Sequence, residues 1–345
     1  MDANQNDHID MKQLPKVDLH RHLEGTLRLD TMMELSRTYG ITLPIKPALT
    51  ALVQVQETDP YNFSNFLSKF QTLRLFYVSE KVIRRITHEA IMDAAADNVR
   101  HLELRFTPVA LSRAQSYPLG HVMDWVIESA QVASAAVGIT TCLIASVNRH
   151  ESVSQAEAVA REAIYRKNSG IVGLDLAGSE AEYPALPFRS ILREARLSGL
   201  RVTVHAGEWG GAENVREAIQ DLHADHIGHG VRVLEDPALV DLARELCIPF
   251  EVCITSNHQS GVVNDLSMHP FVQMLSSGLN ATINTDDPSI SDIDLSDEYN
   301  LAYNRLGISL HVLKERILAA AWASFLPEEE KHKLVQRLEG ELSRF

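Results

Sequence analysis

The stretch that decides the fold reads Lys16-Val17-Asp18-Leu19-His20-Arg21-His22-Leu23-Glu24-Gly25. Val17 and Leu19 alternate with polar residues, a pattern that predicts a short buried strand. Because side chains alternate between the two faces of a strand, His20 and His22 are expected on the same side, at its end. Two imidazoles placed in this way can bind one metal ion, although an isolated His-x-His also occurs as two polar residues that end a strand.

Outward from this stretch, predicted helices and strands alternate along the chain. After the first strand, further strands are expected at residues 99–106, 140–147, 171–178, 200–205, 224–228, 248–254 and 280–284, each preceded by a helix. Strict alternation implies parallel strands, and eight of them favour an α/β fold, the (β/α)8 or TIM barrel. An open doubly wound sheet is the alternative, but no Gly-x-Gly-x-x-Gly follows the first strand.

The barrel is expected to span about residues 15–338 of a single domain, residues 1–345, with residues 1–12 flexible and extra helices after the first strand and at the C-terminus. The helical insert of residues 29–78 begins with a helix, continues through an irregular Pro-containing segment at 43–59, and ends with a helix at 62–78. The aromatic face of that last helix is either part of the core or a lid over an aromatic ligand.

Composition and charge exclude several classes of protein. The 345 residues are 45% hydrophobic, and 32 Lys and Arg face 46 Asp and Glu, giving a formal charge of −14. Such a surface argues against nucleic acid or an anionic membrane as a partner. Cys142, Cys247 and Cys253 are too few and too scattered for a disulfide framework, so a reducing cytoplasm is expected. Neither a signal peptide nor an apolar run of membrane-spanning length is visible.

Polar residues gather at the predicted ends of the strands, where barrels of this type carry their chemistry. They are His20 and His22 after the first strand, Gly178 after the fourth, His205 and Glu208 after the fifth, His229 after the sixth, and Asp286 and Asp287 after the eighth. Three histidines and a carboxylate from strands one, five and eight form a set of nitrogen and oxygen ligands. Such a set suits Zn²⁺ with one position left open for water.

Each of these residues has an ordinary structural interpretation when taken alone. His205 could be a core histidine, Asp286 and Asp287 a turn and helix cap, and Glu208 and His229 loop or turn residues. Together these interpretations would require polar residues to gather by chance at one rim of one barrel. The other histidines show no such placement and are interpreted as structural: His8, His88, His101, His121, His150, His223, His226, His269, His311 and His332.

Five motifs in order resemble the adenosine and adenine deaminase family, a branch of the metal-dependent amidohydrolases. They are His20-Arg21-His22-Leu23-Glu24-Gly25, Asp175-Leu176-Ala177-Gly178, His205-Ala206-Gly207-Glu208, Ile227-Gly228-His229-Gly230 and Asn284-Thr285-Asp286-Asp287-Pro288. The resemblance extends from Pro15 to about Leu338. Taken together the motifs are specific to the family, whereas His-x-His and a late Asp indicate only the wider superfamily.

The resemblance implies a zinc-dependent hydrolase that converts a 6-aminopurine, as base or nucleoside, to the 6-oxo product and ammonia. One Zn²⁺ per subunit would be held by His20, His22, His205 and Asp286. Glu208 would give its proton to purine N1, and His229 would orient and help to deprotonate the attacking water. The remaining contacts to the substrate would come from Asp287 at N7, the Gly178 backbone N–H at N3, and the side chains of Glu24 and His22.

Two absent motifs narrow this interpretation. Many amidohydrolases bridge two metals with a lysine on strand four, but Gly173-Leu174-Asp175-Leu176-Ala177-Gly178 contains none, so one metal is expected. The other zinc deaminase architecture combines His-x-Glu with Pro-Cys-x-x-Cys. No Cys-x-x-Cys occurs in this chain, so thiolate ligands are not expected.

The substrate is the least decided feature. Adenosine deaminases usually carry Asp at the position of Glu24, where it reaches the ribose 5′-hydroxyl, whereas Glu is common among deaminases of free adenine and other 6-aminopurines. Members also often have Cys-Pro where this chain has Cys253-Ile254. The long insert at 29–78 favours a substrate larger than a bare base. We therefore expect adenosine or a 5′-modified adenosine, with adenine as the alternative.

Two other classes of protein remain as alternatives. A purine-binding protein without catalytic activity would need neither Glu208 nor His229 beside the four ligands. A cyclic-amide hydrolase of the same superfamily would cleave cyclic amides and ignore 6-aminopurines.

Overall fold

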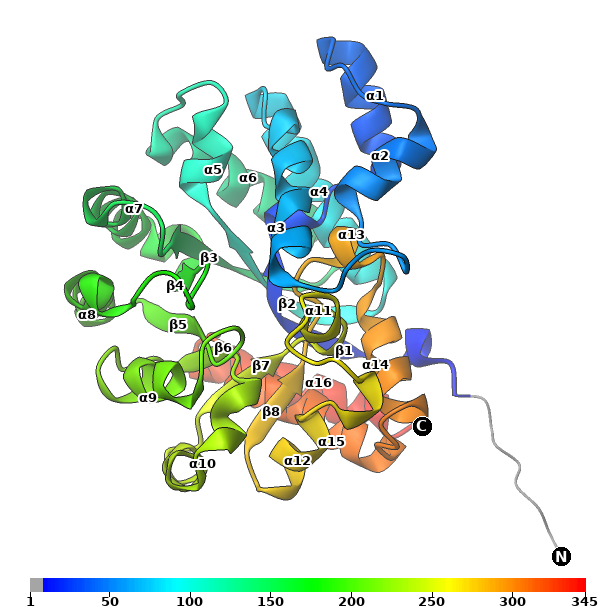
Figure 1. The fold of residues 1–345 in the computed structure, drawn as a ribbon, viewed down its shortest axis with the longest axis vertical. Helices are drawn as coiled ribbons and strands as arrows, with labels where there is room; N and C mark the ends of the chain where they lie inside the picture. The colour runs from blue at the N-terminus through cyan, green and yellow to red at the C-terminus, as the bar shows by residue number, and fades with distance from the viewer. Residues whose placement is uncertain (1–8) are drawn as a thin grey trace, which may run out of the picture.

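A computed structural model describes residues 9–345, in which eight strands form one parallel sheet that curves into a barrel (Figure 1). The strands are β1 (Lys16–His22), β2 (Val99–Phe106), β3 (Thr140–Asn148), β4 (Ile171–Ala177), β5 (Arg201–Ala206), β6 (His226–His229), β7 (Pro249–Val252) and β8 (Asn280–Ile283). Their order in the sheet is their order in the chain, β1 to β8. The predicted (β/α)8 barrel is therefore confirmed.

The barrel closes at the seam between β8 and β1. Leu19 N donates to the side-chain Oδ1 of Asn284 at 2.9 Å. Just beyond β8, Asp286 N donates to His20 O, and His22 N donates to Asp286 O, both at 2.8 Å. Closure brings Asp286 beside the two histidines of β1, although the residues lie at opposite ends of the chain.

Helices surround the barrel, and one of them, α11 (Ile254–Gln259), lies over its end in the view of Figure 1. They are α4 (Glu80–Ala96), α5 (Pro108–Arg113), α6 (Leu119–Val137), α7 (Val153–Tyr165), α8 (Arg189–Leu197), α9 (Ala212–Gln220), α10 (Pro237–Glu245), α11 (Ile254–Gln259), α12 (Phe271–Ser276), α13 (Pro288–Ser291), α14 (Leu295–Asn304), α15 (Leu310–Ala323) and α16 (Glu328–Leu342). α15 contacts both β1 and β8 and so covers the seam. Over residues 9–345, no helix combines the length and the apolar character that crossing a membrane requires.

The strands alternate apolar residues that pack under the helices with polar residues that line the interior. On β2, Leu104 and Phe106 alternate with Glu103 and Arg105, and all four are buried. Arg105 donates to Glu251 of β7 across the interior at 2.8 Å. A near-continuous apolar run is the usual pattern of a strand buried on both faces, so these polar residues mark a specialised interior.

The insert between β1 and β2 contains α1 (Leu29–Tyr39), α2 (Lys46–Val53) and α3 (Phe63–Leu73). The expectation of an irregular segment at 43–59 is wrong, because α2 forms within it. Pro47 lies in the first turn of α2, where a missing N–H costs no helical hydrogen bond. Leu49 and Val53, one turn apart, are buried in the core. The proline is therefore accommodated in the first turn of this helix and does not interrupt it.

Two further boundaries differ from the predictions. β7 ends at Val252, two residues before the predicted end of its strand, because Ile254 begins α11. The Glu298 carboxylate accepts from Ile254 N at 2.7 Å and Thr255 N at 3.0 Å, and so satisfies the free N–H groups at the start of that helix. Of the residues expected to be flexible, 1–8 lie outside the described residues, and Met11 is buried.

Candidate functional site

A cavity of about 420 Å³ lies at the carboxyl ends of the strands. Eight of the predicted site residues line it: His22, Glu24, Gly178, His205, Glu208, His229, Asp286 and Asp287. The ninth, His20, is buried beneath it. The aromatic face of α3 forms one wall through Phe63, Phe66 and Phe70, so this face contacts the cavity as well as the core.

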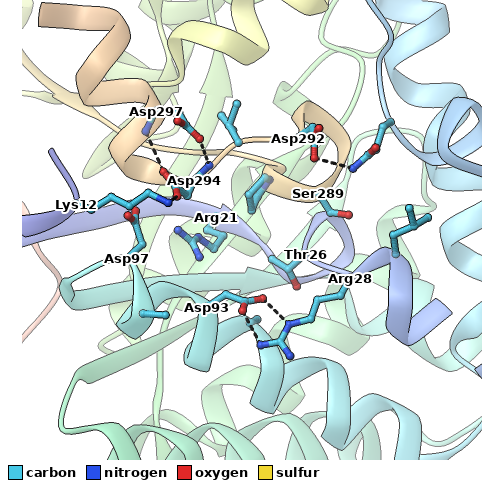
Figure 2. Close-up of a pocket in the computed structure, with 16 residues that line it drawn as sticks. Lys12, Arg21, Thr26, Arg28, Asp93, Asp97, Ser289, Asp292, Asp294 and Asp297 are labelled. Carbon is cyan, nitrogen blue, oxygen red and sulfur yellow. Dashed lines mark hydrogen bonds and ion pairs between the residues drawn. The ribbon is translucent and has the colours of Figure 1, made fainter. Parts of the chain in front are cut away.

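A larger cavity of about 700 Å³ lies beside Arg21 of β1, and Figure 2 shows its lining. None of the predicted site residues lines it. Its charged groups are largely paired with one another, since Arg28 Nη2 lies 2.5 Å from Asp93 Oδ1 and Lys12 Nζ lies 3.1 Å from Asp294 Oδ2. The smaller cavity, which holds the buried titratable groups, is therefore the candidate active site.

Three imidazoles and one carboxylate converge at the floor of the candidate active site. The Nε2 atoms of His20 and His22 lie 3.2 and 3.4 Å from Asp286 Oδ1. His22 Nε2 lies 3.2 Å from His205 Nε2. Neighbouring ligand atoms of a tetrahedral zinc site with bonds of about 2.0–2.1 Å lie roughly 3.3 Å apart. His20 Nε2 is buried and has no hydrogen bond within residues 9–345, as expected of an atom that binds a metal ion. The residues present therefore fit a tetrahedral zinc ion.

Among the described residues, the four whose ligand atoms all lie within 4.8 Å of one another are His20, His205, His229 and Asp286, with His229 in place of the predicted His22. His229 Nε2 lies 4.0 Å from Asp286 Oδ2 and 3.5 Å from Glu208 Oε2. His229 thus stands between the cluster and Glu208. The three contacts near 3.3 Å favour the predicted set, with His229 beside it.

Two rings of the cluster, those of His20 and His205, contact buried carboxylates on the side away from the other ligands. His20 Nδ1 lies 2.8 Å from Glu251 Oε2, and His205 Nδ1 lies 3.0 Å from Asp175 Oδ1. A carboxylate on Nδ1 fixes the ring so that Nε2 faces a metal. Burial alone would raise the pKa of Glu251, but Arg105 and the hydrogen bonds from His20 and His226 hold that pKa well below its usual range.

Glu208 is a carboxyl group in an environment that favours its protonated form. Burial, followed by the charges of Asp286 and Glu180, raises the pKa of Glu208 well above its usual range. The position of its backbone is fixed, because Gly207 N and Glu208 N donate to the carboxylate of Glu180 at 2.8 and 2.6 Å. Glu208 can therefore carry a proton at a pH where exposed glutamates are ionised.

Glu24 and Asp287 present two more buried carboxyl groups to the cavity. Burial raises the pKa of Glu24 to about 7, and burial together with Asp286 and Glu24 raises that of Asp287 well above its usual range. Glu24 Oε1 accepts from Thr107 N at 2.7 Å. Glu24 Oε2 and Asp287 Oδ1 have no hydrogen-bond partner within the described chain. Both oxygens are available to a ligand.

The backbone is unusual at three positions of the site. His229 and Asp286 have φ values of 58° and 65°, and Gly178 has a φ of 92°. A residue other than glycine in this left-handed region costs on the order of 1–3 kcal/mol, and such residues cluster at functional sites. Close approach also requires Gly25, because a Cβ atom there would lie 1.9 Å from Asp287 Oδ1.

Sequence reasoning missed several residues around the site. His150, interpreted as structural, lines the mouth of the cavity. Asn257, whose amide nitrogen lies 3.1 Å from His229 Nδ1, and Glu251 were not singled out. Glu251 lies within the four-residue strand Pro249–Val252, where its side chain is buried. Because a buried carboxylate needs a partner, its position in a strand was a signal of a paired, functional group.

Comparison with known proteins places these features in a family context. A family model described as "Adenosine deaminase" matches residues 15–340. Among curated proteins, the adenosine deaminase of Erwinia tasmaniensis is 38% identical over 330 residues, which cover 94% of this chain and 98% of the relative.

Solved structures show the same fold over nearly the whole chain. An adenine deaminase from Arthrobacter aurescens is 27% identical, with a TM-score of 0.88, over 96% of this chain and 99% of that one. A zinc-bound amidohydrolase from Burkholderia ambifaria is 26% identical, with a TM-score of 0.90, over 100% and 94%. The Arabidopsis protein ADAL, solved with IMP, is 26% identical, with a TM-score of 0.86, over 97% and 98%.

Proposed function

Because the chain belongs to the adenosine deaminase family of hydrolytic deaminases, we propose that it hydrolyses the exocyclic C–N bond of adenosine or a 5′-modified adenosine. Water and the 6-amino nucleoside give the 6-oxo nucleoside and ammonia. The observation that carries this proposal is the buried carboxyl of Glu208, whose pKa burial raises well above its usual range and which lies 3.5 Å from His229, beside the histidine cluster.

The four residues proposed to hold one Zn²⁺ per subunit are His20, His22, His205 and Asp286, for which the ligand spacing supplies the support. When bound, zinc supplies a nucleophilic water near neutral pH. Ser256 Oγ donates to Asp286 Oδ2 at 2.6 Å, which directs the other oxygen, Oδ1, toward the histidines.

The purine ring would be oriented by three groups that line the cavity. Glu208 gives its proton to N1, which draws electrons from C6 and makes that carbon electrophilic. Asp287, whose raised pKa keeps it protonated, donates to N7, and the Gly178 backbone N–H donates to N3. A positioned general acid of this kind contributes typically ~10²–10⁴-fold to the rate.

His229 would orient the attacking water and take its proton. The Asn257 amide at Nδ1 fixes the ring so that Nε2 faces Glu208 and Asp286. Burial lowers the pKa of His229 well below its usual range, so the ring is neutral when the reaction begins. The amide nitrogen of Asn257 faces Nδ1, and its Oδ1 is buried without a partner among the described residues; turning the amide over places Oδ1 against Nδ1–H and leaves Nε2 free to accept the proton.

Deamination of free adenine is a second candidate function, which Glu24 favours. Its Oε2 is buried without a hydrogen bond in the part of the chain described, and a desolvated, unpaired acceptor costs about 1–3 kcal/mol. A ribose hydroxyl or the N9–H of adenine could each donate to it. The aromatic wall of α3, where the Phe63 ring meets Trp209 edge to face with the ring centroids 4.4 Å apart, favours the larger nucleoside.

The test compares kcat/KM for adenosine, 2′-deoxyadenosine, 5′-substituted adenosines and adenine, in the wild type and in Glu24→Asp. Glu182→Asp is the matched control, because Glu182 lines the same cavity but is exposed at its mouth. We expect adenosine to be preferred, and Glu24→Asp to change the ratio of nucleoside to base while the control leaves it unchanged. A preference for adenine of ~100-fold, or about 2.7 kcal/mol in transition-state binding, would overturn the nucleoside assignment.

The remaining expectations about the cell concern location and partners. Cys142, Cys247 and Cys253 are free thiols, as a reducing compartment requires. We propose a cytoplasmic location and a small-molecule purine partner on this basis and on that of the cavity.

A further inference from the structure

We propose that Arg105 is a positioning residue that aligns two of the metal-binding imidazoles through the carboxylates behind them. This inference rests on the proposed zinc site, and it assigns a role to a residue that does not itself line the cavity. Arg105 lies on β2 inside the barrel and is completely buried.

The guanidinium of Arg105 contacts three groups that support the histidine cluster. Its Nη2 donates to Glu251 Oε2 and to the Leu19 carbonyl oxygen, both at 2.8 Å. Its Nη1 lies 3.7 Å from Asp175 Oδ1, an ion-pair distance. Leu19 is the residue before His20, so the guanidinium also anchors the backbone from which that ring projects.

Each carboxylate held by Arg105 holds an imidazole in turn. Glu251 Oε2 lies 2.8 Å from His20 Nδ1, and Asp175 Oδ1 lies 3.0 Å from His205 Nδ1. The oxygens that meet the rings are the same two that face the guanidinium. One planar cation therefore sets the separation of two rings that come from β1 and β5.

This arrangement depends on the shape of arginine as well as on its charge. Arginine presents its N–H groups as a rigid fork, whereas lysine offers a point charge on a flexible chain. A lysine at position 105 would keep the positive charge in the barrel but could not hold Leu19, Glu251 and Asp175 in a fixed relation. A role limited to neutralising the two carboxylates would tolerate that exchange.

The test is Arg105→Lys, with zinc affinity measured by competition with a chromogenic chelator and the ligand geometry read from the visible spectrum of the Co²⁺-loaded protein. We expect zinc affinity to fall about 10–100-fold, as it does when the outer partners of metal ligands are removed, and the Co²⁺ bands to shift. Arg166→Lys is the matched control, because Arg166 is also buried and pairs with a carboxylate, Asp124, at 2.6 Å, yet lies at the end of α7, outside the barrel; the zinc affinity of this variant should match wild type.

The outcomes separate this inference from the proposed function. A wild-type protein that binds no stoichiometric metal contradicts the zinc site itself. Wild-type binding together with an Arg105→Lys affinity within twofold and an unchanged Co²⁺ spectrum overturns only the role of Arg105. If Arg105→Lys does not fold, Glu251→Gln decides, because the amide keeps the size of the side chain but weakens its bonds to Arg105 and His20. An affinity of Glu251→Gln within twofold of wild type then overturns the inference.

Discussion

At the scale of single residues, the site works by setting the charge of neighbouring carboxyl groups in opposite directions. Burial raises the pKa of Glu208, whereas His20 and other nearby histidines, acting against burial, hold that of Asp286 well below its usual range. An ionised carboxylate suits metal binding, and a protonated carboxyl suits proton donation. Asp286 is thereby suited to the proposed metal binding, and Glu208 to the proposed proton donation.

Glu208→Gln should therefore keep the zinc and the fold but lose most turnover. The amide conserves size and hydrogen bonding, yet it cannot deliver a proton to N1, so kcat should fall ~10²–10⁴-fold. Steady-state kinetics, metal content and thermal unfolding measure the three properties. Glu182→Gln, an exposed glutamate of the same cavity, should leave kcat within a few-fold. Wild-type kcat in Glu208→Gln would contradict the assignment of the acid.

Sequence reasoning singled out residues at strand ends, which the structure brings to one cavity, but it missed the residues that support them. His20 and His205 were predicted because each follows an apolar strand whose end must lie at the rim of the barrel. Glu251, by contrast, contacts His20 across 231 positions of sequence and lies within a strand. Such a partnership depends on how far the barrel curves, which no local pattern records.

At the scale of elements, one short helix outside the predicted pattern, α11, contributes contacts to the site. α11 carries Ser256 and Asn257, which contact Asp286 and His229. Its first N–H groups are satisfied by Glu298 of α14, so the position of α11 depends on a buried carboxylate. The predicted strand over 248–254 missed this helix because the apolar residues Val252, Cys253 and Ile254 continue across the end of the strand.

The buried Glu298 predicts a pH dependence of stability. Burial raises its pKa from 4.5 to about 7, so between these values the folded state holds a proton that the unfolded state has lost. Stability from this group is therefore present below pH 4.5 and is lost as the pH rises through 7. Glu298→Gln removes the titration, so between pH 5 and 8 its unfolding free energy should gain about 2–3 kcal/mol relative to wild type.

Urea unfolding of both proteins at pH 5 and pH 8 measures this difference. Glu182→Gln, at an exposed glutamate, is the control. Its unfolding free energy relative to wild type should be the same at the two pH values. A constant difference between wild type and Glu298→Gln across that range would show that Glu298 is ionised at both pH values.

At the scale of the whole molecule, the proposed metal ligands come from distant parts of the chain. His20 and His22 belong to β1, His205 to β5, and Asp286 to the turn after β8. A ligand that binds only the folded state stabilises it, by about 4 kcal/mol when its free concentration is 1,000 times Kd. The metal should therefore stabilise the entire barrel.

Removal of metal by a chelator should lower Tm by roughly 5–10 °C and abolish turnover, and added Zn²⁺ should restore both. Differential scanning calorimetry and the ultraviolet change on deamination follow the two properties. The His205→Ala variant should show the low Tm without any chelator. Full turnover after complete removal of metal would contradict the proposed zinc dependence.

The closure of the barrel has a consequence for how the protein matures. Asp286 reaches His20 and His22 only through the seam at which the last strand docks on the first. A ribosome releases residue 286 long after residue 22, so a nascent chain carries two of the four proposed ligands until His205 is made, and three until Asp286 follows. With the ligand set proposed above, a prematurely terminated polypeptide that lacks Asp286 would lack a complete metal site, so incomplete chains should show no deaminase activity.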